Sequence, residues 1–338
     1  MELDPARISI GGIEINNSCN LNCIMCETQN STRPRKIMNP TLFDRIARQL
    51  KRSGQNYINM YTFGEVLINP QLEEFLRILR KYELKTRIST NGQILDRRLD
   101  LLCRYSDVIH RLRFSIDGAT KQVYEKIRRP GKFEKLLDNL ELLKKINMGH
   151  RYFKEISIVS IVSKDTIDHL AYLFRFYSHY APMRNIQLSL LNGLALDTSY
   201  FLTANILPER YCLQYPCQQI FSENIKVYFD GRVTVCCRDF NGELTYGNLG
   251  ENEPEELINN EVVKQFRRDH LAKKIPLCRD CYHIEPEVQR LFSLFWQALI
   301  YRYERNWQVD RMQAKFDCFF RTFAKNTPCE DNFMTLFA

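Results

Sequence analysis

The chain has 338 residues, of which 44% are hydrophobic and 26% charged, and 48 Lys and Arg against 40 Asp and Glu give a net charge of +8. This composition predicts a folded protein with room for one large domain and one small one, and it argues against disorder. The basic residues form scattered pairs and no apolar stretch could span a bilayer, so we expect neither a nucleic-acid partner nor a membrane partner.

Residues 7–190 alternate between strand-like and helix-like segments. The predicted strands are 8–16, 57–63, 85–90, 108–116, 155–162 and 185–191. The predicted helices are 40–52, 71–82, 95–105, 121–145 with an interruption at Pro130-Gly131, and 165–180. Six strands alternating with helices predict an α/β fold, a partial (β/α)6 TIM-like barrel with a parallel sheet inside. Active sites of such barrels lie at the carboxyl ends of the strands.

The rest of the chain predicts a smaller unit and a helical end. Apolar runs on both sides of Asp230-Gly231 predict a β-hairpin with a two-residue turn, and Pro254 opens a predicted helix over 253–272. A helix or helix pair over 286–323 is predicted to dock on the barrel, with a dimer or partner surface as the alternative. The predicted domains are a barrel (1–191), a linker (192–216), an auxiliary domain (217–284) and a C-terminal helical extension (285–338).

Three cysteines follow the first predicted strand in a C-x3-C-x2-C motif: Cys19, Cys23 and Cys26. A four-iron cluster takes four ligands, so three thiolates leave one iron open to a ligand from outside the protein. A zinc site is the alternative, but it would need a fourth Cys or His nearby, and the next His is His110. The motif resembles that of the radical S-adenosylmethionine (SAM) superfamily. In this superfamily the open iron of a [4Fe–4S] cluster binds SAM, and one electron then releases a 5′-deoxyadenosyl radical.

Further segments at the ends of predicted strands resemble the SAM-binding segments of that superfamily. The residues that the resemblance assigns to SAM are Gly64, Glu65, Ser89, Asn91, Ser115, Arg128, Val159 and Leu191. It implies that Gly64-Glu65 holds the SAM ammonium, that the Ser, Asn and Arg side chains contact ribose and carboxylate, and that the two apolar residues pack on adenine. Phe63 and Val66 replace the Gly and Pro that usually flank the Gly-Glu pair, and Met25 stands where many relatives carry an aromatic.

A second set of cysteines resembles the twitch form of the SPASM auxiliary domain: Cys217, Cys236, Cys278 and Cys281. Four thiolates can close a second [4Fe–4S] cluster, and a four-cysteine zinc site is the alternative. No further C-x5-C-x3-C run follows, which argues against a full SPASM domain with two auxiliary clusters.

The adjacent pair Cys236-Cys237 requires a choice, because neighbouring side chains on a strand point to opposite faces. The resemblance assigns the ligand to Cys236, which leaves Cys237 either as a hydrogen donor to a substrate radical or as a buried inert thiol. Arg238 and Asp239 are the nearby polar candidates for substrate contact. The four remaining cysteines are interpreted as structural: Cys103, Cys212, Cys318 and Cys329.

The resemblance implies an enzyme that abstracts a hydrogen atom from its substrate, followed by dehydrogenation or by epimerisation. Because 18 residues precede Cys19, we expect no separate leader-binding domain, which favours a small polar natural-product or sugar-type substrate or a short peptide. Peptide modification, a non-catalytic Fe–S or Zn redox sensor and a nucleic-acid-modifying enzyme are the alternatives. The expected electron donor is an external one such as flavodoxin or ferredoxin. Twelve cysteines without a signal peptide predict reduced thiols and a cytoplasmic location.

Overall fold

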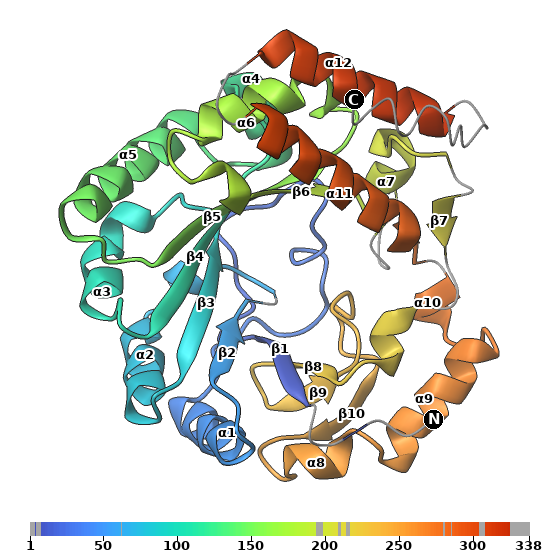
Figure 1. The fold of residues 1–338 in the computed structure, drawn as a ribbon. Coiled ribbons are helices and arrows are strands. Elements are labelled where there is room, and N and C mark those ends of the chain that lie inside the picture. The colour runs from blue at the N-terminus through green and yellow to red at the C-terminus, as the bar shows by residue number, and fades with distance from the viewer. Residues whose placement is uncertain are drawn as a thin grey trace.

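A five-stranded parallel sheet forms the centre of the larger half of the molecule, with the strand order β2-β3-β4-β5-β6 (Figure 1). The computed structural model describes residues 4, 8–61, 63–193, 199–208, 211–213, 217–279, 281–284, 286–303 and 308–324. The strands of the sheet are β2 (Tyr57–Met60), β3 (Lys85–Thr90), β4 (Ile109–Ser115), β5 (Glu155–Val162) and β6 (Ile186–Leu190). The helices between them are α1 (Pro40–Arg52), α2 (Leu72–Lys81), α3 (Leu99–Arg104), α4 (Lys121–Ile127), α5 (Phe133–His150) and α6 (Leu170–Tyr177). The predicted α/β barrel fold is confirmed.

The two faces of this sheet differ in polarity. In β3 the side chains of Thr86, Ile88 and Thr90 are buried toward the helices, whereas those of the alternate residues are half-exposed. Because successive strand residues point to opposite faces, the half-exposed set, which includes Arg87 and Ser89, faces the inside of the barrel. The apolar core therefore lies between sheet and helices, and the barrel interior is polar.

The first strand, β1 (Ser9–Ile13), differs from the prediction because it does not join the barrel sheet. It pairs in parallel with β8 (Asn224–Val227) in the four-stranded sheet β1-β8-β9-β10. A Cβ atom on Gly11 would lie 1.6 Å from the Asn224 side chain, so a larger residue there would displace that side chain. Side chains still tie β1 to the barrel edge, since Asn59 Nδ2 of β2 donates to the Ile10 carbonyl at 3.4 Å. The barrel thus has five paired strands rather than six.

The auxiliary region contains β9 (Arg232–Thr234), β10 (Thr245–Asn248), α8 (Pro254–Leu257), α9 (Glu261–Leu271) and α10 (Pro276–Arg279). The predicted hairpin is present as β8-β9, but its loop has three residues, because Tyr228 N–H donates to the Arg232 carbonyl and Gly231 adopts φ +85°. The single helix predicted over 253–272 is wrong. Asn260 accepts from the Val263 N–H and starts a second helix, α9, directly after α8.

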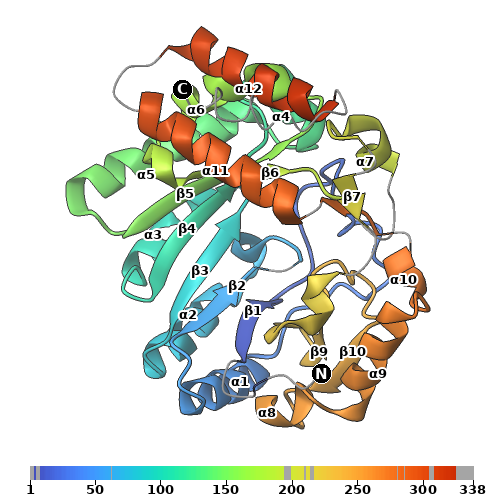
Figure 2. The same ribbon diagram turned by 45° about the vertical axis from the view of Figure 1, so that its right-hand side comes forward.

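Two C-terminal helices, α11 (Pro286–Tyr303) and α12 (Val309–Ala324), lie against the barrel helices on the β6 side, as Figure 2 shows. Phe174 of α6 stacks on Trp296 at 5.7 Å and on Phe316 at 6.3 Å, and the Gln313 side chain bonds to the Ala171 N–H at 3.1 Å. The helix pair is thus anchored on α6. Between barrel and auxiliary region lie α7 (Ser199–Ala204) and the small sheet of β7 (Cys212–Leu213) and β11 (His283–Ile284).

The described helices include none that is both long and apolar enough to cross a bilayer. The side chains of Cys103 and Cys318, which the sequence predicts to be structural, are partly buried and pack against the core. Cys329 lies outside the described residues, and so does the side chain of Cys212.

Candidate active site

A cavity of about 200 Å³ lies at the carboxyl ends of the barrel strands. Nine of the eleven residues predicted to hold the first cluster and SAM line it: Cys19, Cys23, Cys26, Gly64, Glu65, Ser89, Asn91, Ser115 and Arg128. The cavity wall also includes Tyr61, Thr28 and Thr90, which the sequence reasoning did not single out. The residues come from segments more than a hundred positions apart, so the fold alone brings them together.

The three thiols of the first motif stand on a loop that is fixed from both sides. The N–H of Ile24 donates to the Ile127 carbonyl at the end of α4, and Cys26 N–H closes a turn on the Cys23 carbonyl at 2.9 Å. Burial raises the pKa of the Cys19 thiol to about 12 and also raises that of Cys23. The Leu21 N–H, 3.4 Å from Cys19 Sγ, is a donor that would stabilise a thiolate there.

The donor set fits a four-iron cluster better than a single ion. No group of three Cys, His, Asp or Glu side chains in the described part of the chain converges closely enough to hold one metal ion. Cys19, Cys23 and Cys26 instead line the wall of one cavity, as ligands on three different corners of a cluster would. The chemistry of three soft sulfur donors is that of iron–sulfur ligation.

Gly64 and Glu65 join the β2 end of the cavity to the cysteine loop. Gly64 adopts φ +79°, and a Cβ atom there would lie 2.6 Å from the Ser18 carbonyl oxygen, so this position requires glycine. The Glu65 carboxylate is buried and accepts hydrogen bonds from the N–H groups of Asn91 at 2.7 Å and Leu67 at 3.1 Å. Burial raises the pKa of Glu65. This carboxyl therefore fixes the loops after β2 and β3 while it lines the cavity.

The polar side chains after β3 and β4 meet on the cavity floor. The hydroxyls of Ser89 and Ser115 lie 3.2 Å apart, and Asn91 Nδ2 donates to Asn20 Oδ1 of the cysteine loop at 2.9 Å. Among the described residues, neither serine hydroxyl makes a hydrogen bond to the backbone that would direct it away from the cavity. The two neighbouring strands therefore present a pair of hydroxyls to whatever occupies the cavity.

Arg128 is held between a carboxylate and a cluster thiol. Its Nε donates to Asp117 Oδ2 at 2.6 Å, and its Nη1 lies 3.8 Å from Cys23 Sγ. Burial acts to lower the pKa of Arg128, but the charges of Asp117 and Cys23 raise it above its ordinary value. Asp117 is fully buried and also accepts from the Ile161 N–H. Asp117 therefore orients Arg128, a role that no motif in the sequence indicated.

Two predicted SAM contacts do not line the cavity. Val159 lies opposite Ser115 in the β4-β5 register, half-buried inside the barrel. Leu191 is 2% exposed, and its N–H donates to the Val162 carbonyl. Leu191 directly follows β6, whereas Val159 lies within β5, three residues before its end. Leu191 is committed to the apolar core and leaves little surface for adenine.

The four thiols of the auxiliary region form a second group. Burial raises the pKa of Cys217, Cys236 and Cys278, in the last case to about 12, and the charge of Cys281 adds to the shift in all three. The thiol of Cys281 therefore lies within electrostatic reach of the other three. Their chemistry suits a cluster closed by protein ligands.

Arg238 contacts this thiol group rather than the barrel interior. Its Nη1 donates to Cys281 Sγ at 3.2 Å and to the carbonyls of Tyr282 and Gly193, each at 2.8 Å, and its backbone N–H points to Cys236 Sγ at 3.3 Å. The expected substrate contact by Arg238 is therefore not what this arrangement shows. Arg238 instead places a positive charge beside the thiols of Cys236 and Cys281.

Asp239 is also placed away from substrate. Its side chain is fully buried and accepts from the N–H groups of Glu243 and Leu244, each at 2.8 Å, and from the Thr234 hydroxyl at 3.1 Å. A carboxylate with three donors inside its own loop stabilises that loop and is not available as a substrate base. From the sequence alone the role of Asp239 could not be distinguished from that of Arg238, because both are polar residues next to Cys236 and Cys237.

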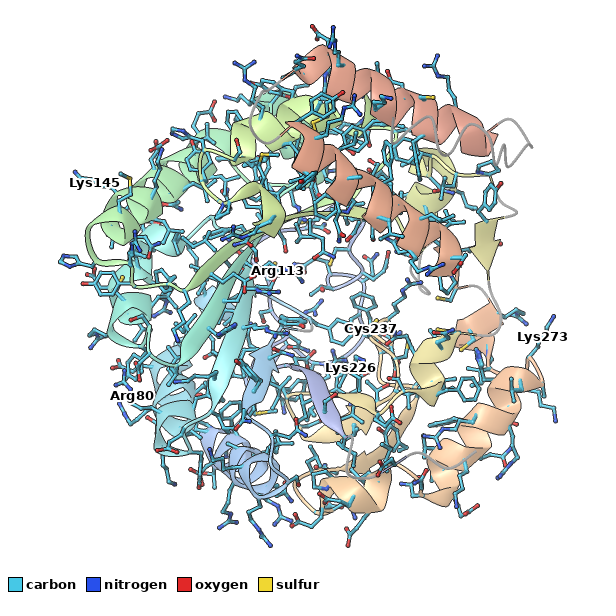
Figure 3. The ribbon with its side chains drawn as sticks, in the orientation of Figure 1. Arg80, Arg113, Lys145, Lys226, Cys237 and Lys273 are labelled. Atoms are coloured by element: carbon cyan, nitrogen blue, oxygen red, sulfur yellow. The ribbon has the colours of Figure 1, made fainter. Side chains whose placement is uncertain are left out.

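Cys237 has the opposite environment. Its side chain is exposed, which rules out the buried-thiol alternative, and Figure 3 places it on the edge of the auxiliary region that faces the barrel, close to Lys226. Cys236, one residue earlier, points into the thiol group. The side chains of Cys236 and Cys237 thus point in opposite directions, as neighbouring side chains of an extended segment do.

The fold and the two thiol groups define an iron–sulfur protein on a partial α/β barrel. The profile of the radical SAM superfamily matches residues 13–176, and that of the SPASM iron–sulfur cluster-binding domain matches residues 217–282. The chain thus contains a radical SAM domain followed by a SPASM-type iron–sulfur cluster-binding domain. Its cofactors are therefore SAM and [4Fe–4S] clusters.

Among curated proteins, the chain is 25% identical over 321 residues to a cysteine-type anaerobic sulfatase-maturating enzyme of Clostridium novyi, covering 78% of this chain and 82% of that protein. It is 25% identical over 158 residues to the mycofactocin maturase MftC of Mycolicibacterium smegmatis, covering 46% of this chain but only 38% of that protein. Among solved structures, SuiB of Streptococcus suis bound to SAM shares the fold with a TM-score of 0.59 at 14% identity, covering 76% of this chain and 67% of that one. BtrN in complex with AdoMet and 2-DOIA shares it with a TM-score of 0.51 at 19% identity, covering 83% and 94%.

Proposed function

We propose that this enzyme uses the cavity at the strand ends to bind SAM on a cluster held by Cys19, Cys23 and Cys26, and that it oxidises or epimerises a small polar substrate inside the barrel. The observation that carries the proposal is the convergence of nine cluster and SAM candidates on one cavity. When bound there, the reduced cluster and SAM supply a 5′-deoxyadenosyl radical for hydrogen abstraction.

The chain's own residues have distinct tasks in this proposal. Arg128, held by Asp117, presents a fixed guanidinium to a carboxylate. The hydroxyls of Ser89 and Ser115 suit the ribose, and the buried Glu65 faces the position of a cation. Val159 and Leu191 keep only a peripheral role next to adenine.

The fate of the substrate radical depends on the auxiliary region. We propose that Cys217, Cys236, Cys278 and Cys281 hold a second four-iron cluster, which would accept an electron in a dehydrogenation. The exposed Cys237 would instead return a hydrogen atom in an epimerisation. We assign the domain boundaries as predicted, 1–191, 192–216, 217–284 and 285–338, and expect a flavodoxin or ferredoxin as electron donor in the cytoplasm.

Peptide modification is the second candidate. It is favoured by relatives whose names identify them as maturases and by SuiB, which has been solved bound to its precursor peptide SuiA at a TM-score of 0.57 to this chain. The chain spans less than half of the mycofactocin maturase, so that protein's activity is no more than a guide.

The test is anaerobic reconstitution followed by two measurements on the same sample. We expect about eight irons and eight sulfides per chain, and reductive formation of 5′-deoxyadenosine and methionine from SAM. Cys26→Ala should abolish SAM cleavage, whereas Cys103→Ala, a core thiol outside both groups, should not. Zinc in place of iron, or no 5′-deoxyadenosine from wild-type protein, would favour the redox-sensor alternative.

A further inference from the structure

A second cavity, of about 250 Å³, lies where strands β4, β5 and β6 meet helix α11. The charged side chains on its wall are three arginines and one glutamate: Arg111, Arg113, Arg184 and Glu155. Neutral polar residues, among them Ser157 and Gln187 from the strands and Trp296 from α11, complete the wall. This cavity is separate from the thiol-lined one, since the two share no lining residue.

Among the residues that the structure describes, three hydrogen-bond donors on this wall are buried and have neither a hydrogen-bond partner nor an ion-pair partner. They are the Nε of Arg113, the hydroxyl of Ser157 and the indole Nε1 of Trp296. Ser157 and Trp296 are 5% and 6% exposed, so water has little access to them. Leaving a buried donor unsatisfied costs free energy, so three on one cavity wall indicate a ligand that accepts hydrogen bonds.

The charged side chains on the cavity wall give it a net positive charge. Glu155 pairs with Arg111, with 2.6 Å between Oε1 and Nε. Arg113 makes no ion pair within the described residues, and its Nη2 donates only to the amide oxygen of Gln187, at 2.6 Å. Burial lowers the pKa of Arg113; Arg87 and Arg111 lie near enough to repel it, and Glu155, which is paired with Arg111, lies near enough to attract it. A positive side chain with a neutral hydrogen-bond partner, two positive neighbours and one already paired negative neighbour favours an anionic ligand.

The strand register places Arg113 next to the SAM cavity. Arg113 pairs with Ser89 across β3-β4, and Ser115 is two residues further along β4 on the same face. Both serines line the SAM cavity, and two residues of strand span roughly 7 Å. Figure 3 shows Arg113 at the inside of the barrel rather than on its outer surface. An anion at Arg113 would therefore hold an attached carbon skeleton close to the SAM site.

We infer that this cavity binds an anionic group of the substrate, a carboxylate or a phosphate, through Arg113, Ser157 and Trp296. The inference rests on the proposed function, because it assigns the polar substrate of that reaction a negative charge and a fixed end. Three donors from two strands and a helix would grip the oxygens of one anionic group, and the remainder of the molecule would extend toward Ser89 and Ser115.

The test is isothermal titration calorimetry on the reconstituted chain, with inorganic phosphate and acetate as probes and chloride at equal ionic strength as the blank. We expect saturable binding of at least one probe, weakened at least tenfold in Arg113→Gln and partly restored in Arg113→Lys. Arg80→Gln is the matched control, because Arg80 carries the same charge on the outer surface, where it pairs with Asp107, and it should bind as wild type does.

A site-specific readout comes from tryptophan emission. In a Trp307→Phe background Trp296 is the only tryptophan, and its emission should shift with the same saturation curve as the calorimetry. Phosphate binding without acetate binding would identify a phosphorylated substrate, and the reverse a carboxylate. No saturable binding to wild type, the same signal with chloride, or an Arg113→Gln protein that is folded and binds as wild type would each overturn the inference. SAM cleavage is scored separately: anion binding without any 5′-deoxyadenosine from wild type would contradict the proposed function alone.

Discussion

Arg33 and Glu14 form a bidentate ion pair at the point where the cysteine loop, the barrel entrance and the auxiliary region meet. The two Nη–Oε distances are 2.8 and 2.7 Å, and both side chains are buried. Arg33 Nε also donates to the Phe240 carbonyl at 2.6 Å, and its guanidinium lies 4.2 Å from the ring centre of Tyr228. One side chain thus fixes the loop of the first thiol group against the region that carries the second.

This pair predicts a large stability loss when one partner is removed. Arg33→Met would leave the Glu14 carboxyl buried without its charge partner, which typically destabilises a protein by roughly 3–5 kcal/mol. Lys81→Met is the control, because the Lys81–Asp44 pair is largely exposed and should contribute less than about 1 kcal/mol. Urea unfolding of the two variants under one set of conditions measures the difference. Equal losses would show that Arg33 does not join the two regions.

We expect variants of the two adjacent cysteines, Cys236 and Cys237, to differ in iron content. The side chain of Cys236 is directed into the thiol group and that of Cys237 is exposed, so Cys236→Ala should lose about four of about eight irons, whereas Cys237→Ala should keep all of them. Iron and sulfide analysis after anaerobic reconstitution measures both. The two variants are matched in size and sequence position, so a reversed result would place the ligand at Cys237.

From the position of Arg238 we predict an effect on the reduction potential of the proposed second cluster. Its guanidinium is 3.2 Å from Cys281 Sγ, and a positive charge with a hydrogen bond to a ligand sulfur favours the reduced, more negative cluster. Arg238→Gln should therefore lower the auxiliary potential by on the order of 50 mV, about tenfold in the one-electron equilibrium. Potentiometric titration followed by electron paramagnetic resonance measures this shift. Arg232→Gln serves as control, since Arg232 pairs with Asp230 at the surface, and it should leave the potential unchanged.

Sequence and structure agree most closely where local pattern decides the outcome. Helix α1 and strands β3 and β5 have the predicted bounds, because strong periodicity and the Asn39 cap define them. The predicted place of β1 was wrong, because its partner β8 lies more than two hundred residues away in the sequence. No spacing within residues 8–16 contains that information.

The site shows the same division between local and long-range signals. Motif residues such as Cys19 and Ser89 could be predicted because each belongs to a short motif that is local in the sequence. Asp239 and Arg238 could not be assigned correctly, because their partners, Glu243 in a turn and Cys281 after a helix, are known only in the folded chain. The anion cavity was missed because Arg113 and Trp296 belong to elements that no motif connects.

We expect the carboxyl of Asp165 to make a pH-dependent contribution to the free energy of unfolding. Burial acts to raise the pKa of this carboxyl, but hydrogen bonds from Lys126 at 2.6 Å and Tyr200 at 2.8 Å hold it below its ordinary value of 3.8. A depressed native pKa stabilises the fold above the unfolded pKa, and the contribution is lost as pH falls through the native value. Asp165→Asn should thus cost up to about 1 kcal/mol at pH 7 and progressively less below about pH 4. Thermal unfolding across that range measures it, with Tyr200→Phe expected to show part of the effect. A difference that stays constant with pH would mean that the carboxylate charge is not involved.

The exposed thiol of Cys237 separates the two proposed fates of the substrate radical. A thiol exchanges its hydrogen with solvent, so epimerisation through Cys237 in deuterated water should place one deuterium in the product, because the donated atom comes from S–D. Cys237→Ala should stop epimerisation and spare dehydrogenation, which needs the auxiliary cluster and no donor thiol. Mass spectrometry of the turnover products measures both effects, and Cys103→Ala controls for the loss of an unrelated thiol. If Cys237→Ala retained full epimerase activity with deuterium in the product, another residue would be the donor, and the exposure of Cys237 toward the barrel would have no part in the chemistry.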